Sequence, residues 1–220
     1  NVTGNVLVER KIGTLSGYHF LSSPVQGAFV NNSVSGWRDD FTILTSVDNI
    51  QFIPGSTYSV LPTVFEYDET NLNPNSAYGF IGATGTTDPI TPLKGFACVV
   101  PANTVVDVFG VVNNGPVNYS VTKASDGINL IGNPYPSPMN WTTFQTHNTN
   151  LETTYKAFKT TGGYAGSYGE YNSFTSLGTN GVGNIIASSQ AFMVTATTAG
   201  AIQALNTDRT TDLNPTYFSQ

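Results

Sequence analysis

The sequence contains few charged residues, one cysteine and no long apolar run. Charged side chains make up 10% of the 220 residues, well below the usual quarter for a soluble domain. Lys and Arg number 8 against 14 Asp and Glu, which gives a net charge of −6. Nucleic-acid binding needs clustered cations, and an anionic membrane repels an acidic surface, so neither partner is expected. No stretch approaches the roughly 20 apolar residues of a spanning helix, which argues against membrane insertion.

Groups that could perform catalysis are also scarce. The single cysteine, Cys98, lies in an apolar segment and is expected to be a small buried side chain. The two histidines are far apart, and the sequence contains no Gly-x-Ser-x-Gly, His-Glu-x-x-His or Cys-x-x-Cys motif. A glycosidase needs two facing carboxylates; Glu66 and Asp68 would share one face of a strand, but no motif accompanies them. We therefore expect that the protein is not an enzyme.

Aromatic, hydroxyl and amide side chains are abundant instead. The chain has 11 Tyr, 13 Phe and 22 Gly, and Asn, Thr and Ser fill the polar positions. Short stretches of alternating polarity between Gly and Pro turns predict many short strands, and only residues 142–149 favour a helix. The pattern predicts one all-β domain over residues 1–220, a jelly-roll-like β-sandwich. A surface solvated by hydroxyls and amides is typical of an extracellular protein.

The most distinctive segment, residues 127–141, is a strand that runs into a proline-rich corner. Glycine can take a positive φ, asparagine tolerates left-handed geometry, and proline fixes φ and lacks an N–H donor. Trp141 closes the segment and is expected to fold back onto the core. We expect a structural role for these residues and for a similar proline earlier in the chain: Pro24, Gly132, Asn133, Pro134, Pro136, Pro138 and Trp141.

The corner occurs twice, which suggests a duplicated half-domain. Residues 17–25 align with 127–135 without a gap, 64–67 align loosely with 154–157, and 90–98 align with 186–194. The matches keep their order along the chain. The predicted halves are about 1–122 and 123–220; chance similarity among short strands is the alternative.

Two groups of residues are candidates for binding. Residues 161–183 are predicted to form a long loop, and loops of that length are often functional. Tyrosines can stack on sugar faces while amides bond the hydroxyls, so the loop predicts a carbohydrate site at Tyr164, Tyr168, Tyr171 and Asn172. Alternatively, the tyrosines pack on their own sheet or touch a neighbouring chain.

Oxygen-rich loops offer possible calcium ligands. Ca²⁺ takes carboxylate and carbonyl oxygens, so Asp68 and Glu69, or the Asp39–Asp40 pair, are candidates for a calcium site. The alternative is that these carboxylates accept hydrogen bonds from backbone N–H groups. No other cofactor is expected.

The start of the chain and the corner resemble one known type of module. Three segments carry the likeness. The first is residues 1–12 with the following Gly-Tyr-His-Phe-Leu-Ser-Ser-Pro-Val, and the second is the corner Asn-Leu-Ile-Gly-Asn-Pro-Tyr-Pro-Ser-Pro-Met-Asn-Trp. The third is Thr-Asp-Arg-Thr-Thr at 207–211. They are similar to segments of β-rich repeat modules in large bacterial cell-surface proteins of the type IX secretion route. Those modules belong to adhesins and filaments and offer no catalytic residues. The resemblance implies an extracellular location at the bacterial surface.

These observations lead to two functional hypotheses. The first is a non-catalytic structural or adhesive module, including a fibre building block, whose partners are neighbouring modules or identical copies. A predicted edge strand over residues 6–12 would offer a place for strand addition. The second is a carbohydrate-binding module that uses the tyrosines of residues 161–183 and has surface glycans as partners.

Overall fold

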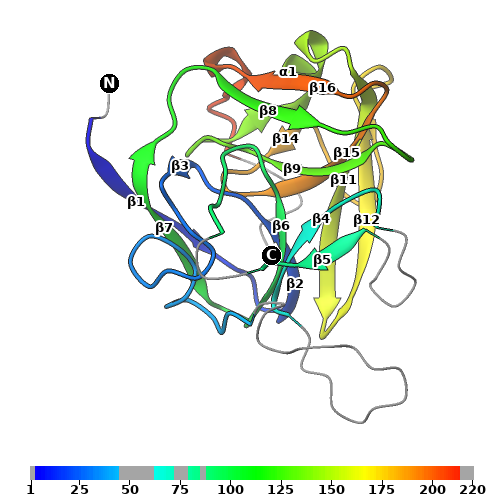
Figure 1. The fold of residues 1–220 in the computed structure, drawn as a ribbon. Coiled ribbons are helices and arrows are strands. Elements are labelled where there is room, and N and C mark those ends of the chain that lie inside the picture. The colour runs from blue at the N-terminus through cyan, green and yellow to red at the C-terminus, as the bar shows by residue number, and fades with distance from the viewer. Residues whose placement is uncertain (1–2, 45–61, 72–78, 85–87, 214–220) are drawn as a thin grey trace.

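The computed structural model shows an all-β, sandwich-like protein, as the sequence predicted. It describes residues 3–44, 62–71, 79–84 and 88–213. Within these ranges the secondary structure is antiparallel strands, one short helix and one 3-10 turn (Figure 1). The elements are β1 (Asn5–Lys11), β2 (Gly17–Leu21), β3 (Val25–Gln26), β4 (Val64–Tyr67), β5 (Phe80–Gly82), β6 (Phe96–Val100), β7 (Val105–Val112), β8 (Val117–Val121), β9 (Ile128–Gly132), β10 (Met139–Asn140), α1 (Trp141–His147), β11 (Leu151–Gly162), β12 (Ala165–Asn172), β13 (Leu177–Gly178), β14 (Ile185–Ile186), β15 (Ala191–Ala196), β16 (Gly200–Ala204) and η1 (Asn206–Asp208).

Two larger sheets form the centre of the molecule. One has the strand order β2-β6-β4-β5, and the other has the order β9-β15-β11-β12 with the short β13 at its margin. Smaller sheets, β1-β7-β3, β8-β16 and β10-β14, complete the fold. The short helix expected after the corner is present as α1, whose N-terminus is capped by the Asn140 side chain accepting from Thr143 N.

The two larger sheets pair their strands in corresponding registers. In the first sheet Leu21 lies opposite Phe96, and in the second Ile131 lies opposite Phe192. The sequence alignment equates these same residues, Leu21 with Ile131 and Phe96 with Phe192. The register agreement therefore supports the prediction of two related halves, which stays a prediction.

One part of that alignment is wrong by one residue. Val64 lies opposite Cys98, and Tyr155 lies opposite Val194. Since Cys98 corresponds to Val194, the partner of Tyr155 in the first half is Val64, not the Phe65 of the alignment. Both Val64 and Tyr155 are buried. The four-residue match at 64–67 was too loose to fix a strand register, which a shift of one residue changes completely.

The halves also exchange hydrogen bonds in a reciprocal way. Ser22 N donates to Ser189 O at 3.0 Å, and Gly132 N donates to Leu93 O at 2.9 Å. Ser22 corresponds to Gly132, and Leu93 corresponds to Ser189. Leu93 and Ser189 both have a positive φ, of 67° and 59°, which is uncommon outside glycine. Each half thus holds the other through the same unusual backbone bend.

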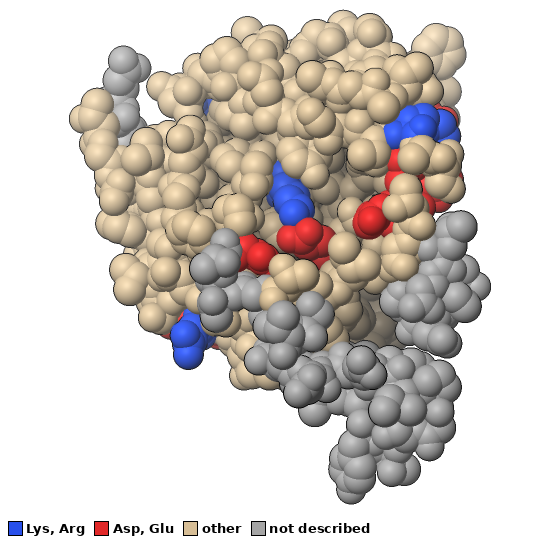
Figure 2. All heavy atoms as spheres, in the orientation of Figure 1, with Lys and Arg blue, Asp and Glu red and all other residues tan. Residues whose placement is uncertain are grey.

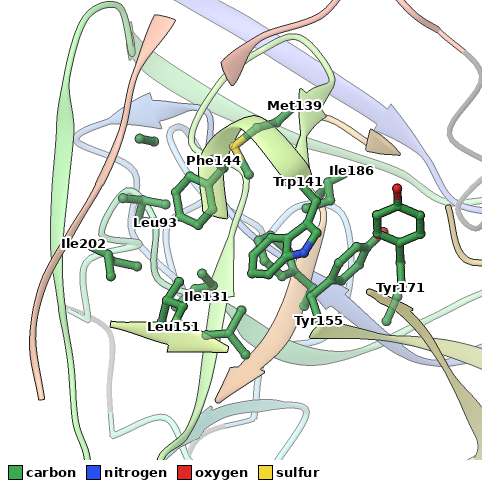
Figure 3. Packing of buried hydrophobic residues seen from close by; sticks show 14 of the residues in the cluster. Leu93, Ile131, Met139, Trp141, Phe144, Leu151, Tyr155, Tyr171, Ile186 and Ile202 are labelled. Carbon is green, nitrogen blue, oxygen red and sulfur yellow. The ribbon is translucent and has the colours of Figure 1, made fainter. Parts of the chain in front are cut away.

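Three clusters of buried side chains fill the interior. The largest gathers around Trp141, which is fully buried as predicted and lies beside Tyr155 (Figure 3). A second cluster surrounds Trp37. Trp37 meets Phe96 edge-to-face at 5.6 Å, as Trp141 meets Phe192 at 5.9 Å, both at 81°. The third cluster lies between the two larger sheets and is rich in phenylalanine.

The proline-rich corner is held by Asn133 rather than by unusual dihedral angles. Neither Gly132 nor Asn133 has a positive φ. Asn133 is fully buried, accepts from Tyr135 N at 3.0 Å and donates to Ser137 O at 2.9 Å. A Cβ at Gly132 would lie 2.2 Å from Ser22 Cβ, so glycine is needed here for close approach of the two halves.

Backbone carbonyls of three corner prolines bond residues from other segments. Pro24 O accepts from Asn113 N at 3.0 Å, and Pro134 O accepts from Asn113 Nδ2 at 2.8 Å. Pro138 O accepts from Thr210 N at 3.0 Å, whereas Pro136 is exposed. The buried Asn113 therefore joins the two equivalent corners.

Candidate functional site: an aromatic cleft between the two main sheets

An open cleft lined by aromatic rings lies where the two larger sheets face each other. It has a volume of about 120 Å³. Five residues of the first sheet line it, namely Tyr18, Phe20, Phe65, Phe80 and Ala97. The second sheet contributes Phe158, Tyr164 and Tyr168. The lining contains no charged side chain.

The rings are fixed by contacts with one another. Phe20 stacks on Phe158 at 5.1 Å, and Phe158 meets Tyr168 edge-to-face at 5.2 Å. Tyr18 meets Phe65 at 6.0 Å and Tyr164 at 5.7 Å. Such offset and edge-to-face pairs are favourable arrangements of aromatic quadrupoles. The walls of the cleft are therefore preorganised.

A glycine-rich turn carries Tyr164 to the mouth of the cleft. The turn between β11 and β12 uses Gly162 and Gly163, with φ of 107° and 60°. A Cβ at Gly17, at the start of β2, would lie 2.1 Å from Gly163 O. The absence of a side chain at Gly17 thus lets the turn approach β2 and places Tyr164 beside Tyr18.

The tyrosines at the mouth remain accessible. Tyr164 is 70% exposed and Tyr168 is 40% exposed. Burial, with a smaller contribution from Tyr67, raises the pKa of Tyr168 to about 12. Burial and the neighbouring Tyr164 also raise the pKa of Tyr18. These hydroxyls are neutral near pH 7 and can donate or accept hydrogen bonds.

A second, larger depression lies on the other side of Tyr164. It has a volume of about 440 Å³, and Ser16, Thr42, Thr63 and Gly163 are among its lining residues. Thr63 Oγ1 is already committed, because it donates to Thr42 O at 2.7 Å and accepts from Leu44 N at 2.8 Å. Tyr164 therefore separates an aromatic cleft from a shallower, partly polar hollow.

Two of the four predicted sugar-binding residues do not reach this site. The prediction of a long loop over 161–183 is wrong, because β12 and β13 occupy much of it. Tyr171 is buried against Tyr155 in the largest core cluster. Asn172 holds the turn that follows β12, since its Oδ1 accepts from Phe174 N at 2.9 Å. Tyr164 and Tyr168 do come together.

Glu69, one of the residues proposed to bind calcium, is 4% exposed and faces backbone N–H groups that donate hydrogen bonds to it. It accepts from Ala124 N at 2.7 Å, Ser125 N at 3.1 Å and Gly127 N at 2.6 Å. Burial alone would raise the pKa of Glu69, but these bonds and one from Thr122 lower it to about 2. Glu69 thus anchors the loop before β9.

The other acidic candidates likewise bond their surroundings. Asp68 Oδ1 accepts from Thr70 N at 2.9 Å. Asp40 Oδ2 accepts from Asp107 N at 2.8 Å, and burial, with Asp107 and Asp39 nearby, raises the pKa of Asp40 to about 6. Across the described ranges, no three His, Cys, Asp or Glu side chains are grouped so as to hold a metal ion.

The remaining groups with catalytic potential are also engaged. Cys98 is buried, and burial raises the pKa of its thiol. His147 Nε2 lies 2.9 Å from Asp208 Oδ1, and the buried Asp208 also accepts from Leu205 N at 2.8 Å. The pair of His147 and Asp208 therefore joins α1 to η1.

Most of the surface visible in Figure 2 is neither acidic nor basic, and acidic side chains gather in a band across the middle. No helix among the residues that the structure describes is long and apolar enough to span a membrane. Sequence reasoning missed Tyr18, Phe65, Phe80 and Phe158 as lining residues. The alternating Tyr18–Phe20 pair was a signal that one face of β2 is aromatic.

Comparisons with known proteins bear on the family and not on the activity. Neither the curated proteins nor the solved structures contain a match to this chain. A model of a domain family described as of unknown function, DUF8693, matches residues 1–220. The match covers the whole sequence, and the chain belongs to this family of domains of unknown function, DUF8693.

Proposed function

We propose that the chain is a non-catalytic structural or adhesive module of an extracellular bacterial surface protein, which joins neighbouring modules or identical copies by strand addition. One observation carries the proposal: among the residues that the structure describes, β1 pairs with a strand on one side only, and exposed apolar side chains lie on its outer face. In Figure 1, β1 lies at the margin of the molecule, and β7 is its one partner among the described strands. An exposed edge of this kind is a template for another strand.

The backbone of β1 presents alternate hydrogen-bonding groups to that free side. Ile12 N donates to Thr104 O at 2.8 Å, in register with the β1–β7 ladder. Because antiparallel ladders alternate, the N–H and C=O groups of the even-numbered residues of β1 point to β7. Those of Asn5, Leu7 and Glu9 point away from β7.

The outer face of this ribbon carries both apolar and charged side chains. Leu7 is 53% exposed and lies opposite the partly exposed Phe109, while Val105 and Val111 are exposed beside them. Glu9 lies opposite Asp107, and like charges directly opposite each other are destabilising. Side chains of a strand added beside β1 would pack against Leu7 as cross-strand neighbours, and a cation among them would relieve this repulsion.

The non-catalytic part of the proposal is supported by what the polar groups do. Glu69, Asp40 and Asp208 each accept backbone hydrogen bonds, and Cys98 is enclosed. Sparse charge and the likeness to surface-protein modules support an extracellular location. The resemblance at the corner suits a structural role, because the corner residues bond only to other parts of the fold.

A substitution at Leu7 tests the proposal. Leu7→Pro removes an N–H on the free side of β1 and leaves the bonds to β7, whereas Leu7→Thr keeps the N–H and reduces the apolar area. In sedimentation velocity over a concentration series, we expect wild type to self-associate and Leu7→Pro to associate at least tenfold more weakly. Leu7→Thr should lie between them. A wild type that stays monomeric, or a Leu7→Pro variant that associates normally, would contradict the proposal.

A carbohydrate-binding module is the second candidate, and the position of Tyr164 favours it. This exposed ring stands between an apolar cleft and a hollow that contains hydroxyl groups, so one sugar face could stack while its hydroxyls are bonded. A glycan array with wild type, Tyr164→Ala and Tyr168→Ala decides the matter. Binding that both substitutions abolish would support it, and no binding at millimolar sugar would remove it.

A further inference from the structure

We propose that the aromatic cleft takes the Phe174 side chain of a second copy of this chain, so that copies join head to tail. The inference rests on the proposed assembly of identical copies, and it names a contact distinct from the β1 edge. The observations that carry it are a rigidly presented apolar ring on one part of the surface and a ring-sized, uncharged opening on another.

Phe174 is the ring. It is 84% exposed, the highest value among the large apolar side chains that the structure describes. Aromatic residues, phenylalanine included, are enriched in the cores of protein–protein interfaces, so a protruding ring on an ordered turn can act as an anchor there. The neighbouring Leu177 is also exposed and extends the apolar area.

The turn that carries Phe174 is firmly held. Asn172 Oδ1 accepts from both Phe174 N at 2.9 Å and Thr175 N at 3.0 Å, and Asn172 Nδ2 donates to Thr154 Oγ1 at 2.9 Å. Ser173 Oγ donates to Thr153 O at 3.1 Å. The backbone is therefore ordered before any partner arrives, which lowers the entropic cost of binding.

The cleft matches one phenyl ring in size and chemistry. Its volume of about 120 Å³ is close to that of an apolar cavity of roughly 150 Å³ that is known to bind benzene. Rings on both walls can meet an entering ring edge-to-face. A sugar would find few polar partners inside, because the only side-chain hydroxyls in the lining are those of Tyr18, Tyr164 and Tyr168.

Charge also favours this pair of surfaces. The net charge of −6 makes copies repel one another in most orientations. The turn Ser173–Leu177 contains no charged residue, and neither does the lining of the cleft. These two surfaces can therefore meet without bringing acidic groups together.

The ring cannot enter the cleft of its own chain. Tyr168, at the cleft, lies four residues before Asn172, where β12 ends and the turn with Phe174 begins, and four strand residues span about 13 Å at roughly 3.3 Å per residue. A contact between different patches is heterologous, so it repeats from copy to copy and produces an open chain unless a rotation closes a ring. This geometry agrees with a fibre-forming module.

Complementary variants test the contact. Phe174→Asp removes the ring and leaves the cleft, while Tyr164→Asp places a charge at the mouth of the cleft and leaves the ring. Both sites are exposed, so both variants should fold, which circular dichroism checks. All measurements are made with Leu7→Pro also present, so that pairing through β1 does not contribute. Val34→Asp, at a side chain that is 72% exposed, is the matched control.

We expect each single variant to be monomeric in sedimentation velocity and a mixture of the two to form a one-to-one dimer. Self-association should weaken at least tenfold for each variant and stay unchanged for Val34→Asp. A mixture that remains monomeric overturns the inference, as does a parent protein that never self-associates. Oligosaccharide binding that Tyr164→Asp abolishes, without a mixed dimer, would assign the cleft to sugar instead. The proposed function is judged separately, by the difference in self-association between wild type and Leu7→Pro.

Discussion

Replacement of Glu69 by glutamine should destabilise the protein strongly at neutral pH and far less at acidic pH. The carboxylate is buried and accepts hydrogen bonds from Ala124, Ser125 and Gly127. Glutamine keeps the size of the side chain but turns one acceptor oxygen into a donor. At least one backbone N–H then faces another N–H group, and an unsatisfied buried donor costs about 1–3 kcal/mol.

The pKa of Glu69 sets the magnitude and the pH range. The pKa falls from 4.5 to about 2 on folding, which corresponds to roughly 3 kcal/mol at about 1.4 kcal/mol per pH unit. Solvent around the nearby exposed loop reduces this to about 2 kcal/mol. Because the folded state lowers the pKa, the stabilisation is complete above about pH 5 and is lost as the pH falls towards 2.

Urea denaturation of wild type and Glu69→Gln at pH 7 and pH 3 measures the effect. We expect a loss of about 2–4 kcal/mol at pH 7 and a clearly smaller loss at pH 3. Glu152→Gln, at an exposed position of β11, is the matched control and should change stability little. A loss for Glu69→Gln that is negligible at pH 7, or equal at both pH values, would refute the reasoning.

Three further substitutions probe the packing and charge of the fold. Gly132→Ala should lower the free energy of unfolding, measured by urea denaturation, by at least about 2 kcal/mol, because the new Cβ would lie 2.2 Å from Ser22 Cβ. An unchanged urea midpoint would contradict the close approach of the halves. Trp141→Ala should lower the free energy of unfolding by about 3–5 kcal/mol or prevent folding, because the ring is fully buried among other aromatic rings. A variant of near-wild-type stability would contradict the central position of Trp141 in the core. Asp40→Asn should raise the free energy of unfolding at pH 7 by about 1 kcal/mol, because folding raises the pKa of Asp40 to about 6 and so disfavours its charged form. The gain should vanish below about pH 4. Thermal melts across this pH range measure it, and a loss of stability instead of a gain would contradict the reasoning.

Local patterns in the sequence predicted the class of fold and its corners. Alternating short segments predicted strands, the Asn-Pro corner predicted a rigid bend, and Trp141 was expected to be buried. These features depend on residues close together in the chain, so the sequence displays them directly.

The interpretation of residues 161–183 failed because glycine has two uses. The segment is rich in glycine, which is typical of a loop, but Gly166 and Gly169 both lie in β12. A Cβ at Gly166 would lie 2.1 Å from Phe158 Cζ, and one at Gly169 would lie 2.4 Å from Val182 Cγ2. Glycine there allows close packing of a strand, and a single sequence does not distinguish that use from a turn.

The strand also explains why the predicted tyrosines separate. Tyr168 and Tyr171 are three residues apart, so strand alternation directs them to opposite faces of β12. One face meets the cleft and the other meets the core around Tyr155. The cleft itself collects residues from strands far apart in the sequence, and only the register of the sheets brings them together.

The central claim is that the chain is a module that assembles through the edge of β1. Hydrogen exchange of the β1 amides tests this claim most directly. The amides of Val6 and Val8 point to β7 and should be protected at every protein concentration. The amides of Leu7 and Glu9 point to the free side and should exchange quickly in dilute solution. At high concentration or in assembled material, we predict that their exchange slows at least tenfold. Equally fast exchange of Leu7 and Glu9 in dilute and assembled protein would contradict the account.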